Sequence, residues 1–68
     1  MKIQIVITND FGVFKGEVVE VTEQQHDKVI EMSKDYYMTG FEMNCEDGSF
    51  VIIPPEIIKK SIYKIEYV

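Results

Sequence analysis

The fold of this 68-residue chain is decided by the stretch FEMNCEDGSFVIIPP at residues 41–55. Residues 41–46 alternate strictly between apolar and polar side chains, which is typical of a strand with one buried face. Asp47 and Gly48 then predict a type I′ turn, and residues 49–53 return as the partner strand. The two prolines that follow end this strand, because proline has no N–H to offer a sheet. The stretch therefore predicts an antiparallel hairpin.

The returning strand contains the unbroken apolar run FVII at residues 50–53. A strand without a polar face indicates burial on both faces or at an interface. Beyond the prolines, residues 56–60 predict one short helical turn, and residues 61–68 alternate as a last strand.

Upstream of the hairpin, residues 2–8 alternate as a first strand and residues 14–21 predict a second. Residues 9–12 carry turn chemistry, so these two strands are expected to form another hairpin. Gly16 within the second strand indicates a bulge or the close approach of another backbone.

A helix is expected between the two hairpins. Thr22 is a favourable N-cap, Gln25 completes a capping box, and Gly40 is the expected stop. A helix of about 15 residues is marginal alone, so its stability must come from packing on the sheet. Its spacing predicts a buried stripe flanked by Met32 and Tyr36 and formed by His26, Val29, Ile30, Ser33 and Tyr37.

These elements predict a single α+β domain over residues 1–68 in the order β-β-α-β-β-β. One helix would pack on a twisted antiparallel or partly closed five-stranded sheet. Ten isoleucines and eight valines, with no leucine or alanine, agree with a strand-rich chain.

The charge balance limits the class of partner. Seven lysines oppose twelve acids, the net charge is -5, and arginine is absent. Nucleic acid is therefore not an expected partner, since backbone affinity depends on neutralising phosphates. No apolar run approaches the roughly 20 residues of a membrane span, no signal peptide is visible, and the single Cys45 agrees with a reducing compartment. A cytoplasmic protein is expected.

Catalytic and metal sites are not expected. Cys45 and His26 are the only residues of their types, and they fit unrelated core or boundary positions better than a nucleophile and its base. One cysteine and one histidine cannot supply a structural zinc site, and no calcium-loop spacing is present. No enzyme activity, metal or cofactor is predicted.

Acids recur on the predicted helix at every fourth position. Steps of four residues advance only about 40° around a helix, so these side chains form one line, which we call the acidic ridge. The ridge is either a solvated helix face or a docking surface for a basic partner. It comprises Glu23, Asp27, Glu31 and Asp35.

Two further sets of residues are candidates. Glu42 and Glu46, on the outward face of the strand at 41–46, extend the possible partner surface. A possible anion or nucleotide site, with tyrosines that could also stack on bases, comprises Lys59, Lys60, Tyr63, Lys64 and Tyr67.

Residues 48–62, GSFVIIPPEIIKKSI, resemble the strand, short 3₁₀ turn and strand that end small SH3-like or Sm-like barrels. Such barrels usually carry a helix at the start or not at all, so the helix in the middle is a departure from their pattern. In its brevity and biased composition, the whole chain resembles small proteins encoded by phages and prophages of low-GC Gram-positive bacteria. That resemblance implies a class of roles, many of which are stoichiometric binding of host proteins, and it places the chain in the host cytoplasm if a phage encodes it.

The favoured function is a non-enzymatic protein-binding module that acts through an acidic surface, such as a phage inhibitor of a host enzyme or defence protein. One alternative is a homo-oligomer that binds or sequesters a nucleotide-type ligand. A second alternative is a small-barrel binder of nucleic acid. No membrane partner is expected.

Overall fold

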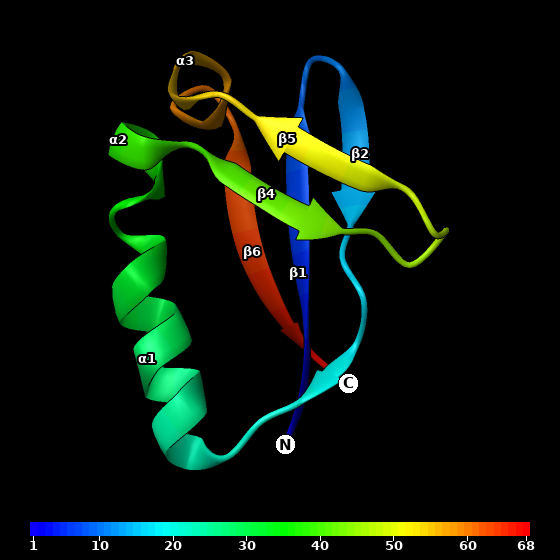
Figure 1. Cartoon of the computed structure of the whole chain (residues 1–68), viewed down its shortest axis with the longest axis vertical. Helices are drawn as coiled ribbons and strands as arrows, with labels where there is room; N and C mark the ends of the chain where they lie inside the picture. Colours follow the sequence, from blue (N-terminus) through cyan, green and yellow to red (C-terminus); the bar gives the residue numbers. More distant parts are fainter.

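A computed structural model describes residues 1–68 and shows a mixed α+β chain with antiparallel strands that do not close into a barrel (Figure 1). The predicted class is confirmed. The one helix expected between the hairpins is instead two helices, the short turn expected at residues 56–60 is a third, and the strands form a four-stranded and a two-stranded sheet. In chain order the elements are β1 (Lys2–Asn9), β2 (Gly12–Lys15), β3 (Val19–Glu20), α1 (Glu23–Ser33), α2 (Tyr36–Thr39), β4 (Phe41–Asn44), β5 (Phe50–Ile53), α3 (Pro55–Ile58) and β6 (Ile62–Tyr67).

The larger sheet is built around β1. Strand β6 pairs along one edge of β1, while β2 and β3 follow one another along the other edge. The second strand predicted for residues 14–21 is thus interrupted, because the chain turns toward β4 at Gly16. The Gly16 N–H donates to the Ile5 carbonyl at 2.8 Å, and the next N–H, of Glu17, donates to Asn44 at 3.2 Å. A Cβ at Gly16 would lie 3.0 Å from the Met43 sulfur, so only glycine fits this approach without displacing a neighbour.

The smaller sheet is the predicted hairpin of β4 and β5. Its turn differs from the type I′ prediction, which requires positive φ at two successive residues. Only Gly48 has positive φ here (90°), and its N–H donates to the Cys45 carbonyl at 3.0 Å. This pattern is a tight turn followed by one left-handed residue, the common form of a three-residue hairpin loop.

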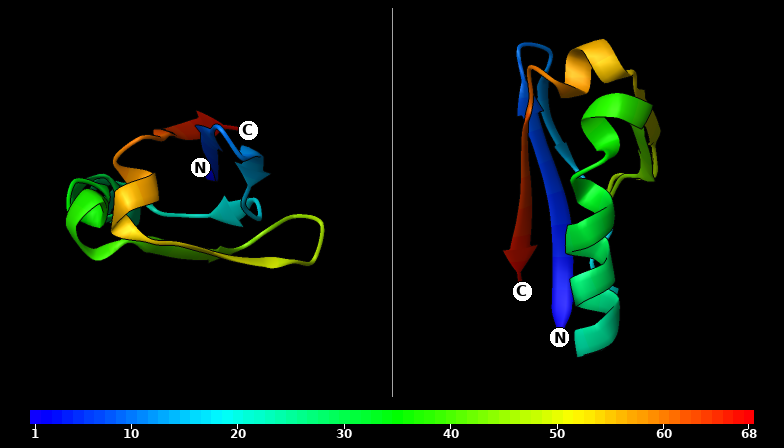
Figure 2. Two further views of the ribbon diagram at one scale, coloured as in Figure 1. Left: turned by 90° about the horizontal axis from the view of Figure 1, so that it is seen from above. Right: turned by 90° about the vertical axis from the view of Figure 1, so that its left-hand side faces the viewer.

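The two sheets face each other, with the three helices along one side (Figure 2). The innermost cluster joins β1, β5 and α3 through Ile7, Ile53 and Ile58. Half-buried aromatic side chains from β2, α2, β4 and β6 surround this cluster. The buried apolar set of the whole chain is small and consists of Ile3, Val6, Ile7, Cys45, Ile53 and Ile58.

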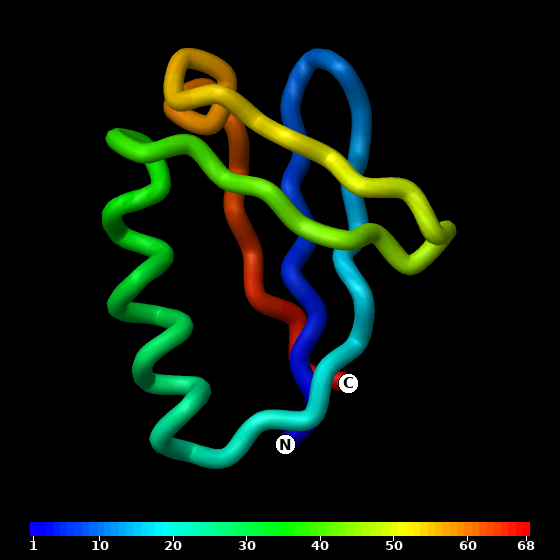
Figure 3. Tube along the Cα trace, in the orientation of Figure 1, coloured from blue at the N-terminus to red at the C-terminus, as the bar shows by residue number.

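The helix is broken at residues 34–35, where the N–H groups of Lys34 and Asp35 bond three residues back. Just before the break, the Ser33 hydroxyl donates to the Val29 carbonyl at 2.6 Å, a contact that bends helices. The break changes the helical phase, so the predicted inward Tyr37 is 52% exposed and Tyr36 takes its place in the core. Both termini lie at the same end of the molecule (Figure 3).

Candidate functional site

The acidic ridge lies on the helical side of the molecule and is exposed along its whole length. Glu23, Asp27 and Glu31 belong to α1, whereas Asp35 lies in the break and precedes α2. Asp27, Glu31 and Asp35 nevertheless border the same shallow surface depression as Lys34. Three of the four acids predicted to line one face, Asp27, Glu31 and Asp35, thus remain neighbours in spite of the broken helix.

No lysine neutralises the ridge. Lys28 and Lys34 each lie three residues from Glu31 in the sequence, but no lysine has its nitrogen within 4.0 Å of a carboxylate oxygen. His26 Nδ1 lies 3.5 Å from Asp27 Oδ1 of the ridge. Like charges four residues apart on a helix destabilise it by about 0.2 to 0.5 kcal/mol per pair. A cationic partner would remove this repulsion.

Helix α1 is anchored to β6 by two hydroxyl groups. Ser33 Oγ and the Tyr63 OH form a hydrogen bond of 2.8 Å, and His26 Nε2 lies 2.6 Å from the Tyr67 OH. At the start of the helix, the Thr22 capping box is formed as predicted. No residue of α1 is buried, so these polar contacts, together with a half-buried stripe, hold the helix against the sheet. The face of α1 that is turned away from the sheet is therefore exposed to solvent.

The residues of the alternative anion or nucleotide site are not brought together. Tyr63 and Tyr67 point toward α1, and the Tyr63 ring packs against Tyr36 and Phe41 at centroid distances of 5.8 and 5.6 Å. Lys64 alternates with Tyr63 along β6 and therefore lies on the opposite face of the strand. The remaining two members, Lys59 and Lys60, follow α3 and are exposed. Both tyrosine hydroxyls thus hold α1.

The Tyr63 phenol, which holds α1 against β6, makes the stability of the fold depend on pH. Burial raises the pKa of the Tyr63 phenol above its ordinary value of 10.0, against the opposing effect of the Ser33 hydrogen bond. Burial also raises the pKa of Tyr36. The folded chain therefore keeps these phenols protonated at a pH where the unfolded chain has begun to lose its protons.

We expect the free energy of unfolding to fall as pH rises from about 10 through the raised pKa values. A Tyr63→Phe variant is expected to lose about 1 kcal/mol at neutral pH, because the Ser33 hydrogen bond is lost, and then to show a smaller alkaline decline than wild type. Urea unfolding at about pH 8 and about pH 11 measures both effects. The matched control is Ser33→Ala, which removes the hydrogen bond but keeps the phenol and should retain the alkaline decline. An equal decline in Tyr63→Phe and wild type would contradict the assignment.

The two strand acids lie apart from the ridge. Glu42 is exposed on β4, where its register partner is Ile52 of β5. Glu46 follows β4 and accepts a hydrogen bond from Gln4 Nε2 at 2.8 Å, while the same amide donates to the Gly16 carbonyl at 2.9 Å. Glu46 therefore helps to join the two sheets, and neither acid belongs to α1.

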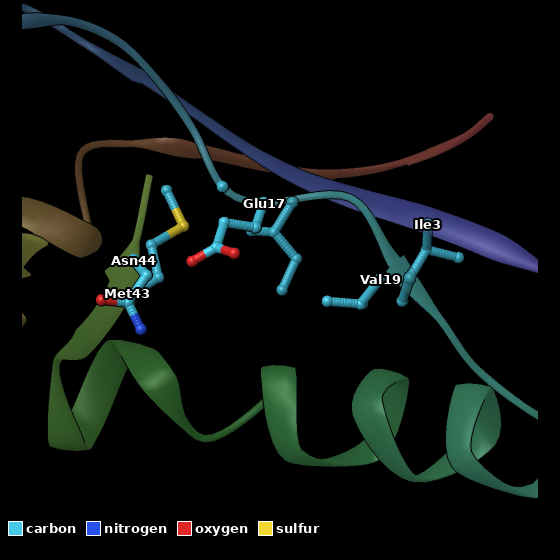
Figure 4. A pocket seen from close by; sticks show the side chains of 7 residues that line it. Ile3, Glu17, Val19, Met43 and Asn44 are labelled. Atoms are coloured by element: carbon cyan, nitrogen blue, oxygen red, sulfur yellow. The ribbon is translucent and has the colours of Figure 1, made fainter. Parts of the chain in front are cut away.

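An apolar hollow of about 250 Å³ opens between the two sheets, and sequence reasoning did not predict it. Ile3 and Val19 line one end, Met43 and Asn44 line the other, and the Glu17 side chain lies between them (Figure 4). The apolar walls suit an aliphatic stem and the carboxylate suits a positive tip, a combination found in lysine and arginine side chains. None of its lining residues comes from α1.

His26 and Cys45 occupy separate environments. The contacts of His26 are with Tyr67 and Asp27, while Cys45 is buried at the bridge between Gly16 and the second sheet. Both positions have a structural explanation, as packing and anchoring residues.

Comparison with protein families, with curated proteins and with solved structures found no match for this chain. None of its helices combines the length and the apolar character needed to span a membrane.

Proposed function

We propose that this chain is a non-enzymatic binding module that engages a basic surface of another protein through the acidic ridge. The observation that carries the proposal is that Glu23, Asp27, Glu31 and Asp35 are all exposed and that no lysine pairs with any of them. Carboxylates that form no salt bridge with a lysine remain available to pair with a partner. Across residues 17–47, nine acids and two lysines sum to a net charge of -7, against +1 on each flank.

The way α1 is held supports this role. A helix fixed by Tyr63 and Tyr67 presents its outer face in a constant orientation, which limits the entropy lost on binding. The hollow beside Glu17 suits the same class of partner, since a lysine or arginine could place its stem against Ile3 and Met43. The ridge supplies charge and the hollow supplies an apolar contact.

We further infer that the two sheets act as one partly closed, five-stranded unit in the order β6, β1, β2, β4, β5. The link is the bridge of Gly16 with Cys45, flanked by the hydrogen bonds from Glu17 to Asn44 and from Glu46 to Lys15. Such a unit would hold the helix and the hollow in a constant relation. The resemblance to small phage proteins makes a host enzyme or defence protein, met in the host cytoplasm, the first class of partner to examine.

The test begins with capture. The wild-type chain, immobilised and exposed to host lysate at low salt, is expected to retain a protein with a basic surface and to release it as salt rises. The reason is that the Debye length falls from about 10 Å at 0.1 M to about 3 Å at 1 M salt. Mass spectrometry of the eluted fractions identifies the partner. Retention of the bound protein through about 1 M salt would contradict a contact carried by the ridge.

A further inference from the structure

The second sheet ends in an open apolar edge. Strand β5 pairs with β4 alone, and no backbone hydrogen bond joins residues 50–53 to any other segment. The Cys45 N–H donates to the Ser49 carbonyl at 2.7 Å, which makes these two residues a hydrogen-bonded pair. Because such pairs alternate along an antiparallel ladder, the N–H and C=O groups of Phe50 and Ile52 point away from β4.

The side chains at this edge are exposed as well. Phe50 is 55% and Ile52 is 68% exposed, and both lie on the outer face of the sheet. An apolar groove runs along β5 and is walled on its far side by Phe11 and Phe14 of the first hairpin. Phe11 is 74% exposed. Strand edges in monomeric proteins are usually protected by a charge, a proline or a bulge, and residues 50–53 contain none of these.

The total surface of the chain is large for its mass. The accessible area is 4882 Å², whereas a compact monomer of 7.9 kDa is expected to expose about 4,400 Å². The excess of roughly 500 Å² per chain is similar to the area that each copy contributes to the smallest specific interfaces, which bury about 1,000 Å² in total. A contact of this size is weak, so its assembly depends on concentration.

We propose that β5 pairs with β5 of a second copy of this chain across a two-fold axis at Val51, forming a continuous four-stranded antiparallel sheet from two hairpins. In this register, Phe50 lies opposite Ile52 of the second copy, and the two residues exchange both backbone hydrogen bonds. Each aromatic side chain then pairs with a β-branched one on the outer face, a favourable cross-strand combination. The prolines beyond Ile53 limit the pairing to this short segment.

Charge favours a second copy over the basic partner at this edge. The strand carries no charge, so a cationic surface gains nothing from it, whereas an apolar strand complements itself. In the proposed register residues 49–53 lie opposite residues 49–53 of the second copy, and none of these residues is charged, so no carboxylate lies within the paired segment. The inference is independent of the acidic ridge, which lies on the helices.

The test is sedimentation equilibrium over a concentration series, with amide hydrogen exchange on the same samples. The wild-type chain is expected to reach twice its 7.9 kDa mass, with half-assembly between about 10 µM and about 1 mM. The amides of Phe50 and Ile52 should become protected as the dimer forms. Ile52→Lys is expected to be monomeric, while Ile62→Lys, which alters an equally exposed isoleucine (68%) on β6, should dimerise as wild type does.

Three results would overturn the proposal. One is a wild-type chain that stays monomeric to about 1 mM. Another is a dimer that survives Ile52→Lys or that Ile62→Lys dissociates equally. The third is a dimer in which the Phe50 and Ile52 amides exchange as fast as in the monomer. This measurement uses the wild-type chain, so it tests the β5 pairing even if the Ile52→Lys variant does not fold.

Discussion

Replacing Ile7 with alanine is expected to remove a large part of the free energy of unfolding of the chain. Ile7 has no exposed surface and contacts Ile53 and Ile58, so its side chain joins the first sheet to β5 and α3. Truncating a fully buried isoleucine removes about 2 to 5 kcal/mol, because the lost burial is accompanied by a cavity. The whole chain is stabilised by only about 3 to 10 kcal/mol, from the usual range per residue.

Urea unfolding followed by circular dichroism measures this loss. The matched control is Ile62→Ala, since Ile62 is 68% exposed on β6 and its loss is expected to change stability by no more than about 0.5 kcal/mol. Equal effects of the two substitutions would show that the sheets are not held together at Ile7.

Neutralising the acidic ridge is expected to lower the affinity for the protein partner without altering the fold. The variant carries Glu23→Gln, Asp27→Asn, Glu31→Gln and Asp35→Asn. An exposed ion pair contributes about 0.2 to 1 kcal/mol, so four pairs correspond to about 1 to 4 kcal/mol, or about 5- to 1,000-fold in Kd. Since α1 is held by Tyr63 and Tyr67, and not by these acids, its circular dichroism spectrum should match that of wild type.

Local chemistry predicted several elements correctly. Thr22 and Gln25 form the expected capping box, with Thr22 Oγ1 accepting from Gln25 at 3.1 Å and Gln25 Oε1 accepting from Thr22 at 2.9 Å. The alternation at residues 41–46 predicted which side chains face inward, and Cys45 is indeed buried. Such features depend on residues close together in the sequence, so they can be predicted without the tertiary structure.

The helix break was not predictable in the same way. Residues 34–35 contain no glycine or proline, and the periodicity continues through them to Tyr37. The break lets Tyr36 pack on Phe41, with ring centroids 4.5 Å apart, and on Tyr63 of β6. The contact with Tyr63 joins residues distant in the sequence, and such tertiary contacts can override the local preference for a continuous helix.

The candidate site likewise has one part that the sequence predicts and one part that it does not. The acids of the ridge follow a helical spacing, so their common face could be predicted from residues 23–35 alone. The hollow could not, because Ile3, Glu17 and Met43 meet only where the chain turns from one sheet to the other at Gly16. Within the predicted lysine and tyrosine cluster, alternation along β6 places Lys64 on the opposite face from Tyr63 and Tyr67.

The most direct test of the proposed function compares two variants of equal charge by titration calorimetry against the captured partner. One is the neutralised ridge, and the other removes four acids elsewhere, so that both change the formal net charge from -5 to -1. The control carries Asp10→Asn, Glu20→Gln, Glu56→Gln and Glu66→Gln. The account predicts a Kd raised about 5- to 1,000-fold by the ridge variant and changed less than about 3-fold by the control. Equal losses in the two variants would mean that only overall charge matters, and an unchanged Kd for the ridge variant would contradict the acidic ridge as the binding surface.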